Sequence, residues 1–260
     1  MQANGAEQLT IAGIRIEAVM AGQGRPLLFL HPGDGFWPHE AWLAELSRRA
    51  RLIAPWHPGF GHSELPRWFG SVDDLAYFYL DLAATLDLQD AVLVGVSFGG
   101  WIAAEMAVRS TARFSHLVLV NPVGIKASDR ETRDIADLHA VGEVERTRLL
   151  YADPARAPRP SEPTDRDFVA IARSREALSL FGWKPYLHNP RLKNWLHRID
   201  RPTLVLAGAN DRVLRPGYLE AYAKAIPEAR LETLADAGHH AHVEQPAALA
   251  RRVHGFAGLD

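Results

Sequence analysis

The sequence contains no cysteine. Disulfide bonds, thiolate nucleophiles and cysteine-based metal sites are therefore excluded. It also lacks any run of about 20 consecutive apolar residues, the length that a membrane-spanning helix requires. Neither sign of charge dominates, because 29 basic and 31 acidic residues leave a formal net charge of −2. This balance argues against a nucleic-acid partner.

Recognisable targeting and cofactor motifs are also missing. The first ten residues are polar and lack a basic segment followed by an apolar run, so we expect no signal peptide and a cytoplasmic location. A phosphate-cradling loop of the type GxxxxGK[ST] is absent, which disfavours a nucleotide-dependent enzyme. We expect a small-molecule substrate, with no cofactor, no metal and no membrane partner. The sequence leaves open whether the chain forms a homo-oligomer.

Short apolar runs alternate with amphipathic segments through most of the 260 residues. Such alternation predicts strands alternating with helices in one α/β domain, with a mostly parallel sheet covered on both faces. Strands are expected at 11–20 (a hairpin interrupted by Gly13), 27–30, 52–54, 91–94, 116–120, 203–207 and 230–234. Helices are expected at 41–50, 71–88, 101–108, 218–225 and 246–253.

One region departs from this alternation of strands and helices. From Ile125 to Ile199 no strand is evident, and the segment is helical in character with a proline-rich break at Asp153–Pro163. Because structureless loops of this size are rare in compact domains, we expect a helical cap at 125–199, inserted into a core formed by 1–124 and 200–260. An extra structural layer is the alternative.

A nucleophile motif follows one of the buried strands. Gly95-Val96-Ser97-Phe98-Gly99 matches G-x-S-x-G, with an apolar strand before it and an apolar helix after it. The motif places serine on a tight strand-to-helix turn, where only small flanking residues allow the strand and helix to approach. Ser97 is therefore the candidate nucleophile. The alternative is a glycine-rich turn with an ordinary capping serine.

Together with four other segments in the same order, this motif resembles the α/β-hydrolase superfamily over roughly Ile14 to Phe256. The segments are Leu28–Gly33 (strand and oxyanion loop), Pro58–Ser63, Gly208–Val213 (G-x-x-D) and Gly238–Pro246 (G-H-x-x-x-x-E-x-P). The resemblance implies a mostly parallel sheet of about eight strands flanked by helices, with a helical cap inserted after the sixth strand.

The resemblance also implies roles for particular residues. Asp211 would be the acid and His239 the base, and the order Ser, Asp, His agrees with the superfamily. A turn aspartate is the other interpretation of Asp211, and His240 and His242 are rivals of His239.

An oxyanion needs two N–H donors, and the resemblance assigns them to the backbones of Phe98 and Gly33. The sequence departs from the family at two points near this site. Pro32 stands where glycine is usual, and it has no N–H to donate; Gly33 can still donate, and Asp34 is the alternative donor. Trp56-His57-Pro58 stands where relatives often carry aspartate two residues before the proline, and the sequence gives no functional account of it.

An aromatic pocket lining would suit an apolar acyl or aromatic substrate. We therefore predict a serine hydrolase that cleaves a carboxylic ester through an acyl-enzyme. The candidate lining residues are Phe36, Trp37, Phe98, Trp101, Phe181, Trp183, Tyr186 and Trp195. Packing of the cap onto the core is the alternative role for most of them.

Other activities remain open at this stage. Ser97-Phe98-Gly99-Gly100 resembles the S-F-G-G of meta-cleavage C–C bond hydrolases, but Val96 stands where asparagine is often found there and His240 where tryptophan commonly follows the base. Thioesterase, lactonase, amidase and cofactor-free peroxidase activities are less favoured. A non-catalytic ligand-binding protein is a further alternative, because fold does not dictate function.

Overall fold

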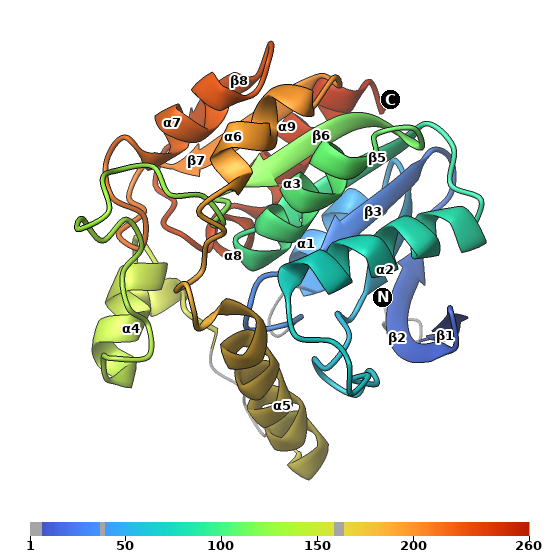
Figure 1. Cartoon of the computed structure of the whole chain (residues 1–260), viewed down its shortest axis with the longest axis horizontal. Coiled ribbons are helices and arrows are strands. Elements are labelled where there is room, and N and C mark those ends of the chain that lie inside the picture. The colour runs from blue at the N-terminus through green and yellow to red at the C-terminus, as the bar shows by residue number, and fades with distance from the viewer. Residues whose placement is uncertain (1–6, 37–39, 159–163, 260) are drawn as a thin grey trace.

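Eight strands form one sheet in the computed structural model, which describes residues 7–36, 40–158 and 164–259 (Figure 1). They are β1 (Glu7–Ile11), β2 (Ile14–Ala21), β3 (Pro26–Leu30), β4 (Arg51–Pro55), β5 (Ala91–Val96), β6 (Phe114–Val120), β7 (Thr203–Gly208) and β8 (Arg230–Leu234). Their order across the sheet is β1-β2-β4-β3-β5-β6-β7-β8. Only the β1–β2 and β2–β4 pairs are antiparallel. The expected mostly parallel eight-stranded sheet is confirmed.

Helices cover both faces of this sheet. The principal helices of the described chain are α1 (Glu40–Leu46), α2 (Val72–Thr85), α3 (Phe98–Arg109), α7 (Tyr218–Ala225), α8 (Ala241–Glu244) and α9 (Pro246–Ala257). Apolar side chains of α2, α3 and α7 share one buried cluster, and those of α1 and α9 share another. β3 supplies both clusters alternately, with Leu28 and Leu30 in the first and Leu27 and Phe29 in the second. This alternation is the period of two that a strand imposes.

Local sequence explains where the central elements begin and end. All six residues of β5 are buried, as expected for a central parallel strand covered on both faces. α2 begins after Ser71, whose hydroxyl accepts a hydrogen bond from the Asp74 N–H, while the Asp74 carboxylate accepts one from the Ser71 N–H. This capping box satisfies two N–H groups that the helix cannot pair internally.

The chain between β6 and β7 is helical in its regular parts. It contains α4 (Glu143–Leu150), α5 (Asp165–Gly182), α6 (Leu192–Trp195) and two short 3₁₀ turns, η1 (Pro154–Arg156) and η2 (Leu196–Arg198). In Figure 1, α4 and α5 lie at the lower edge of the molecule, away from the layers of the sheet. α6 instead packs beside α7, and Leu192 and Leu196 belong to the core.

Candidate active site

Ser97 occupies the turn between β5 and α3 with φ 50° and ψ −111°, a conformation that non-glycine residues rarely adopt. The flanking glycines explain how the turn is accommodated. A Cβ on Gly95 would collide with the carbonyl of Gly99, and a Cβ on Gly99 would collide with the carbonyl of Leu30 at the end of β3. The strained turn presents the Ser97 side chain at the carboxyl ends of the parallel strands.

The three predicted residues, Ser97, His239 and Asp211 (the Ser97 row), meet at this edge of the sheet. Nε2 of His239 lies 2.8 Å from Oγ of Ser97, and Nδ1 of His239 lies 2.8 Å from Oδ2 of Asp211. A carboxylate only accepts hydrogen bonds, so Nδ1 carries the proton and Nε2 can accept the hydrogen of Ser97. His239 is 1% exposed, so its ring is shielded from water, whereas Ser97 and Asp211 are partly exposed. This geometry suits removal of the serine proton during nucleophilic attack.

Backbone N–H groups hold the Asp211 carboxylate. Its Oδ1 accepts from the N–H of Val213 at 2.8 Å and from that of Leu214 at 3.1 Å, which leaves Oδ2 for His239. Asp211 lies three residues after the end of β7, and a Cβ on Gly208 would collide with the carbonyl of Gly238. Glycine at position 208 therefore lets the loops that carry Asp211 and His239 approach each other.

Glu244 holds the loop that carries His239. Its carboxylate accepts from the N–H of Gly238 at 2.7 Å and from the N–H groups of Ala152 and Asp153, both at 3.1 Å. The conformation of the loop before His239 is thus tied to the chain that follows α4.

Asn121, at the end of β6, contacts both loops and was missed by the sequence analysis. Its side-chain amide donates to the carbonyls of Gly238 (3.1 Å) and His239 (2.9 Å), and its Oδ1 accepts from the N–H of Gly208 (2.9 Å). The only signal in the sequence was an asparagine placed directly after a buried strand and before Pro122.

The two expected oxyanion donors come from the start of α3 and from the loop after β3. Phe98 is the first residue of α3, and the first N–H groups of a helix have no partner within it. Gly33 follows β3, and a Cβ there would lie 2.7 Å from the side chain of Leu178 in α5. α5 therefore packs against the loop after β3. The role of these two N–H groups stays a prediction.

The rival histidines lie elsewhere. Nδ1 of His240 lies 3.0 Å from the Tyr151 hydroxyl, and Nε2 lies 3.6 Å from Oδ2 of Asp34. Burial lowers the pKa of His240, although the Asp34 carboxylate opposes this shift. His242 is fully buried, and its ring packs against that of His240. The histidine hydrogen-bonded to Ser97 is His239.

Comparison with known proteins agrees with this architecture. A model of the α/β-hydrolase fold matches residues 25–246. The chain belongs to the α/β-hydrolase family. It is 29% identical to the 2-hydroxymuconate semialdehyde hydrolase of Pseudomonas sp. (strain CF600), over 96% of this chain and 92% of that one.

Solved structures share the fold of this α/β hydrolase. The meta-cleavage product hydrolase CumD from Pseudomonas fluorescens IP01 superimposes with a TM-score of 0.77 at 21% identity, covering 97% of each chain. The esterase RhEst1 from Rhodococcus sp. ECU1013 superimposes with a TM-score of 0.74 at 20% identity, covering 98% of each chain.

The aromatic residues expected to line a pocket fall into distinct environments. Phe36, Phe98, Trp101 and Phe181 are buried in the core clusters, and Tyr186 is partly buried. Trp183 and Trp195 are 60% and 51% exposed, so more than half of each side chain lies outside the core. Trp37 lies outside the described residues.

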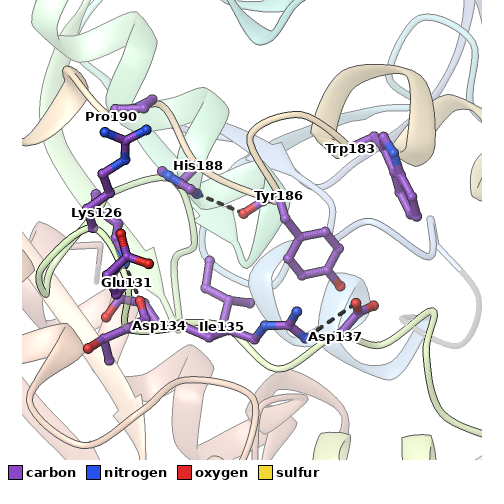
Figure 2. A pocket seen from close by; sticks show the side chains of 12 residues that line it. Lys126, Glu131, Asp134, Ile135, Asp137, Trp183, Tyr186, His188 and Pro190 are labelled. Carbon is purple, nitrogen blue, oxygen red and sulfur yellow. Dashed lines mark hydrogen bonds and ion pairs between the residues drawn. The ribbon is translucent and has the colours of Figure 1, made fainter.

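A cavity of about 800 Å³ lies beside the chain that follows β6 (Figure 2). Charged and aromatic side chains from two stretches, 126–137 and 183–190, line it. Ser97, Asp211 and His239 are not among its lining residues, so it is distinct from the Ser97 row.

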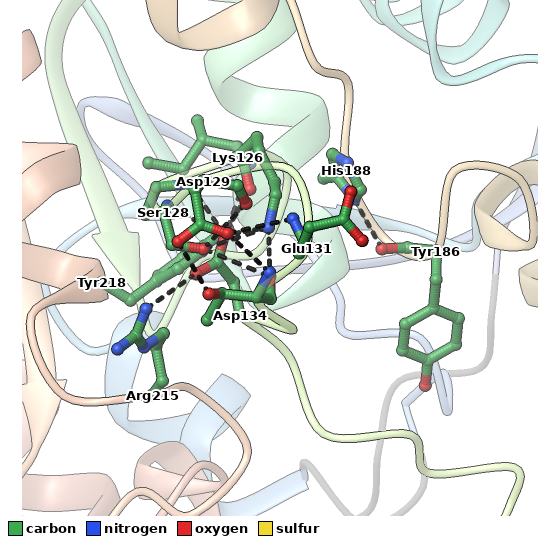
Figure 3. Close-up of polar contacts among 12 residues, drawn as sticks. Lys126, Ser128, Asp129, Glu131, Asp134, Tyr186, His188, Arg215 and Tyr218 are labelled. Carbon is green, nitrogen blue, oxygen red and sulfur yellow. Dashed lines mark hydrogen bonds and ion pairs between the residues drawn. The ribbon is translucent and has the colours of Figure 1, made fainter.

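At one end of this cavity the buried carboxylate of Asp134 organises the local chain (Figure 3). Its Oδ2 accepts from the N–H groups of Ala127 (2.9 Å) and Ser128 (3.2 Å) and from Nζ of Lys126 (3.1 Å). Burial alone would raise the pKa of Asp134, but hydrogen bonds from Ser128, Lys126 and Ala127 hold it below its ordinary value.

The segment around Asp134 is hydrogen-bonded to the loop that carries Asp211. The N–H of Ala136 donates to the carbonyl of Val213 (2.8 Å), and the N–H of Arg215 donates to the carbonyl of Asp134 (3.0 Å). The chain after β6 therefore supports the loop that carries Asp211.

Two features are absent from the described part of the chain. None of its helices combines the length and apolar content needed to cross a lipid bilayer. No group of three or more histidine, aspartate or glutamate side chains there has an arrangement that could hold a metal ion.

Proposed function

We propose that this chain is a serine hydrolase that cleaves a carbon–carbon bond next to a ketone, as in meta-cleavage products. The observation that carries the proposal is the 2.8 Å contact between Oγ of Ser97 and Nε2 of His239, with Asp211 on the far side of the ring. The carbon–carbon preference comes from the relatives, since 2-hydroxymuconate semialdehyde hydrolases from two Pseudomonas sources match more than nine-tenths of the chain.

The proposed reaction begins with attack of Ser97 Oγ on the ketone carbon while His239 takes its proton. The N–H groups of Gly33 and Phe98 would stabilise the resulting oxyanion. The carbon–carbon bond then breaks, its electron pair is delocalised over the conjugated leaving fragment, and His239 returns the proton to carbon. Water, deprotonated by His239, hydrolyses the acyl-enzyme to release a carboxylic acid and restore Ser97.

Ester hydrolysis is the second candidate, and one observation favours it. Val96, where meta-cleavage hydrolases often carry asparagine, is fully buried in the apolar cluster that contains α9. The polar side chain common next to the nucleophile in that group is therefore missing. An ester needs no such group, because its alkoxide leaves with a proton from His239 alone.

We also propose that residues 125–199 act as a cap over this site. Two contacts of α5 support this role. Leu178 lies against Gly33, and the hydroxyl of Ser174 accepts from the N–H of Gly61 at 3.2 Å. A cap in this position would exclude water from the oxyanion and contact the substrate.

The deciding experiment compares turnover of a vinylogous diketone with that of short p-nitrophenyl esters, using Ser97→Ala as the control. Cleavage of the diketone with a much larger kcat/KM supports the carbon–carbon assignment. Turnover of the esters alone would replace it with esterase activity. If neither is cleaved and a fluorophosphonate fails to modify Ser97, the proposal of a serine hydrolase is wrong.

A further inference from the structure

Two fully buried histidines are stacked beside the ends of two neighbouring strands: His31 follows β3 directly, and His57 lies two residues after β4. Their ring centroids are 3.6 Å apart, and the ring planes differ by 28°. Tyr79, from the buried face of α2, contacts His57 from the other side. None of these three side chains belongs to the Ser97 row.

The hydrogen bonds specify the tautomer of each ring. The backbone N–H of His57 donates to Nε2 of His31 (3.0 Å), so the proton of the neutral His31 ring is on Nδ1, which donates to the carbonyl of Pro32 (2.7 Å). Nε2 of His57 lies 2.9 Å from the carbonyl of His31 and must donate to it. Nδ1 of His57 therefore accepts the hydrogen of the Tyr79 hydroxyl.

These bonds end on the peptide that carries the expected oxyanion donor. The carbonyl of Pro32 accepts from Nδ1 of His31 and from the N–H of Gly35 (3.0 Å). A trans peptide is planar, and its N–H points opposite to its C=O. Fixing the direction of the Pro32 carbonyl therefore fixes the direction of the Gly33 N–H.

We propose that His57, oriented by Tyr79, is a positioning residue that aims the Gly33 N–H at the oxyanion through His31. This assigns a role to the histidine of Trp56-His57-Pro58, which has no functional account from sequence alone. The positioning role also fits the proline at position 32. Pro32 has no N–H, so the loop has one backbone donor fewer, and side-chain donors take the place of that group. The inference rests on the proposed function of Gly33 as an oxyanion donor.

The test uses the rate at which a fluorophosphonate modifies Ser97. Ser97 Oγ forms a bond to phosphorus, fluoride leaves, His239 takes the serine proton, and the phosphoryl oxygen occupies the oxyanion site. This rate depends on the aim of the Gly33 N–H but not on whether the natural substrate is a ketone or an ester.

Tyr79→Phe removes only the hydroxyl that orients His57. A hydrogen bond worth about 1 kcal/mol corresponds to roughly a fivefold slower modification of Ser97. Tyr222→Phe is the matched control, because the Tyr222 hydroxyl is equally buried and has no hydrogen-bond partner among the described residues. We expect its rate to equal that of the wild type.

His57→Ala should slow modification further, on the order of 100-fold if the Gly33 N–H is lost to the oxyanion. For the preferred substrate, kcat should fall in both variants while KM stays within about twofold, because the oxyanion forms only after binding. Far-ultraviolet circular dichroism and thermal unfolding measure whether each variant is folded at the assay temperature.

The outcomes separate this inference from the proposed function. If the wild type is modified at Ser97 but Tyr79→Phe and His57→Ala react at its rate, the positioning role is wrong. If His57→Ala fails to fold, the comparison of Tyr79→Phe with Tyr222→Phe decides whether His57 has the positioning role. If the wild-type Ser97 itself is inert, the serine hydrolase proposal fails, and the positioning role that rests on it fails too.

Discussion

The side-chain amide of Asn121, the residue that follows β6, donates to the carbonyl of His239, the proposed base, at 2.9 Å. The same side chain accepts from the N–H of Gly208, immediately before the acid loop. One residue thus fixes the spacing of two loops that converge on Ser97. Asn121 also has φ 42°, a region in which asparagine is favoured over most residues.

We expect Asn121→Gly to lower both stability and kcat. Glycine tolerates the positive φ, so the change isolates loss of the amide, which leaves the Gly208 N–H and the His239 carbonyl without this partner. Each unsatisfied buried group costs about 1–3 kcal/mol. Denaturant unfolding and steady-state kinetics measure the two effects. Asn194→Ala is the control, because Asn194 is exposed. Equal stability and equal kcat in the two variants would contradict the role of Asn121 in holding the two loops.

Asp211→Asn should reduce kcat by roughly 10⁴-fold with little change in KM. An amide that presents its NH₂ to His239 would place the imidazole proton on Nε2, where it cannot accept the proton of Ser97. The carboxamide can still accept from Val213 and Leu214, so the fold should survive. A decrease of less than about tenfold, measured with the preferred substrate, would show that Asp211 does not set the tautomer.

Alanine at His239 and at His240 should have different effects. His239→Ala removes the only ring hydrogen-bonded to Ser97 among the described residues, so turnover should fall by several orders of magnitude. His240→Ala should chiefly reduce stability, because it leaves the buried Tyr151 hydroxyl without its ring partner. Parallel kinetic and unfolding measurements test this, and the reverse pattern would move the base to His240.

Acid should destabilise the protein partly through His57. Burial lowers the pKa of His57 from 6.5 to about 3, despite an opposing backbone hydrogen bond with His31. Between these values the unfolded chain binds a proton that the folded chain does not. Stability is therefore fully present above about pH 6.5 and is lost as the pH falls toward 3.

The His57→Gln variant tests this pH dependence, because glutamine does not titrate. Between pH 4 and 6 its free energy of unfolding should depend less steeply on pH, by up to about 1.4 kcal/mol per pH unit. Tyr222→Phe, which leaves every histidine in place, should retain the wild-type slope. A glutamine variant with that same slope would show that His57 does not remain neutral in the fold.

The features predictable from sequence were those that local spacing determines. The sequence predicts β8 and α7 at their observed bounds, and it predicts the start of α2 to within one residue. The ends of some helices differ from the prediction, because contacts with the rest of the fold determine where these helices stop. α1 ends at Leu46 rather than Ala50, and α2 ends at Thr85 rather than Leu88, before Asp87 turns the chain with φ 43°.

Other features arise from contacts between distant segments and carry no local signal. Asn121 acts on residues more than 80 positions away, across neighbouring strands. His31 and His57 meet because β3 and β4 are adjacent in the sheet, so the sequence around either residue does not predict their contact. The exposure of Trp183 and Trp195 likewise depends on how the chain between β6 and β7 packs.

The most direct test of the account is the site and rate of fluorophosphonate modification, measured by peptide mass spectrometry. We expect a single modified residue, Ser97, with labelling abolished in Ser97→Ala and slowed by orders of magnitude in His239→Ala but not in His240→Ala. Labelling at another residue, or at Ser97 with a rate independent of His239, would contradict it.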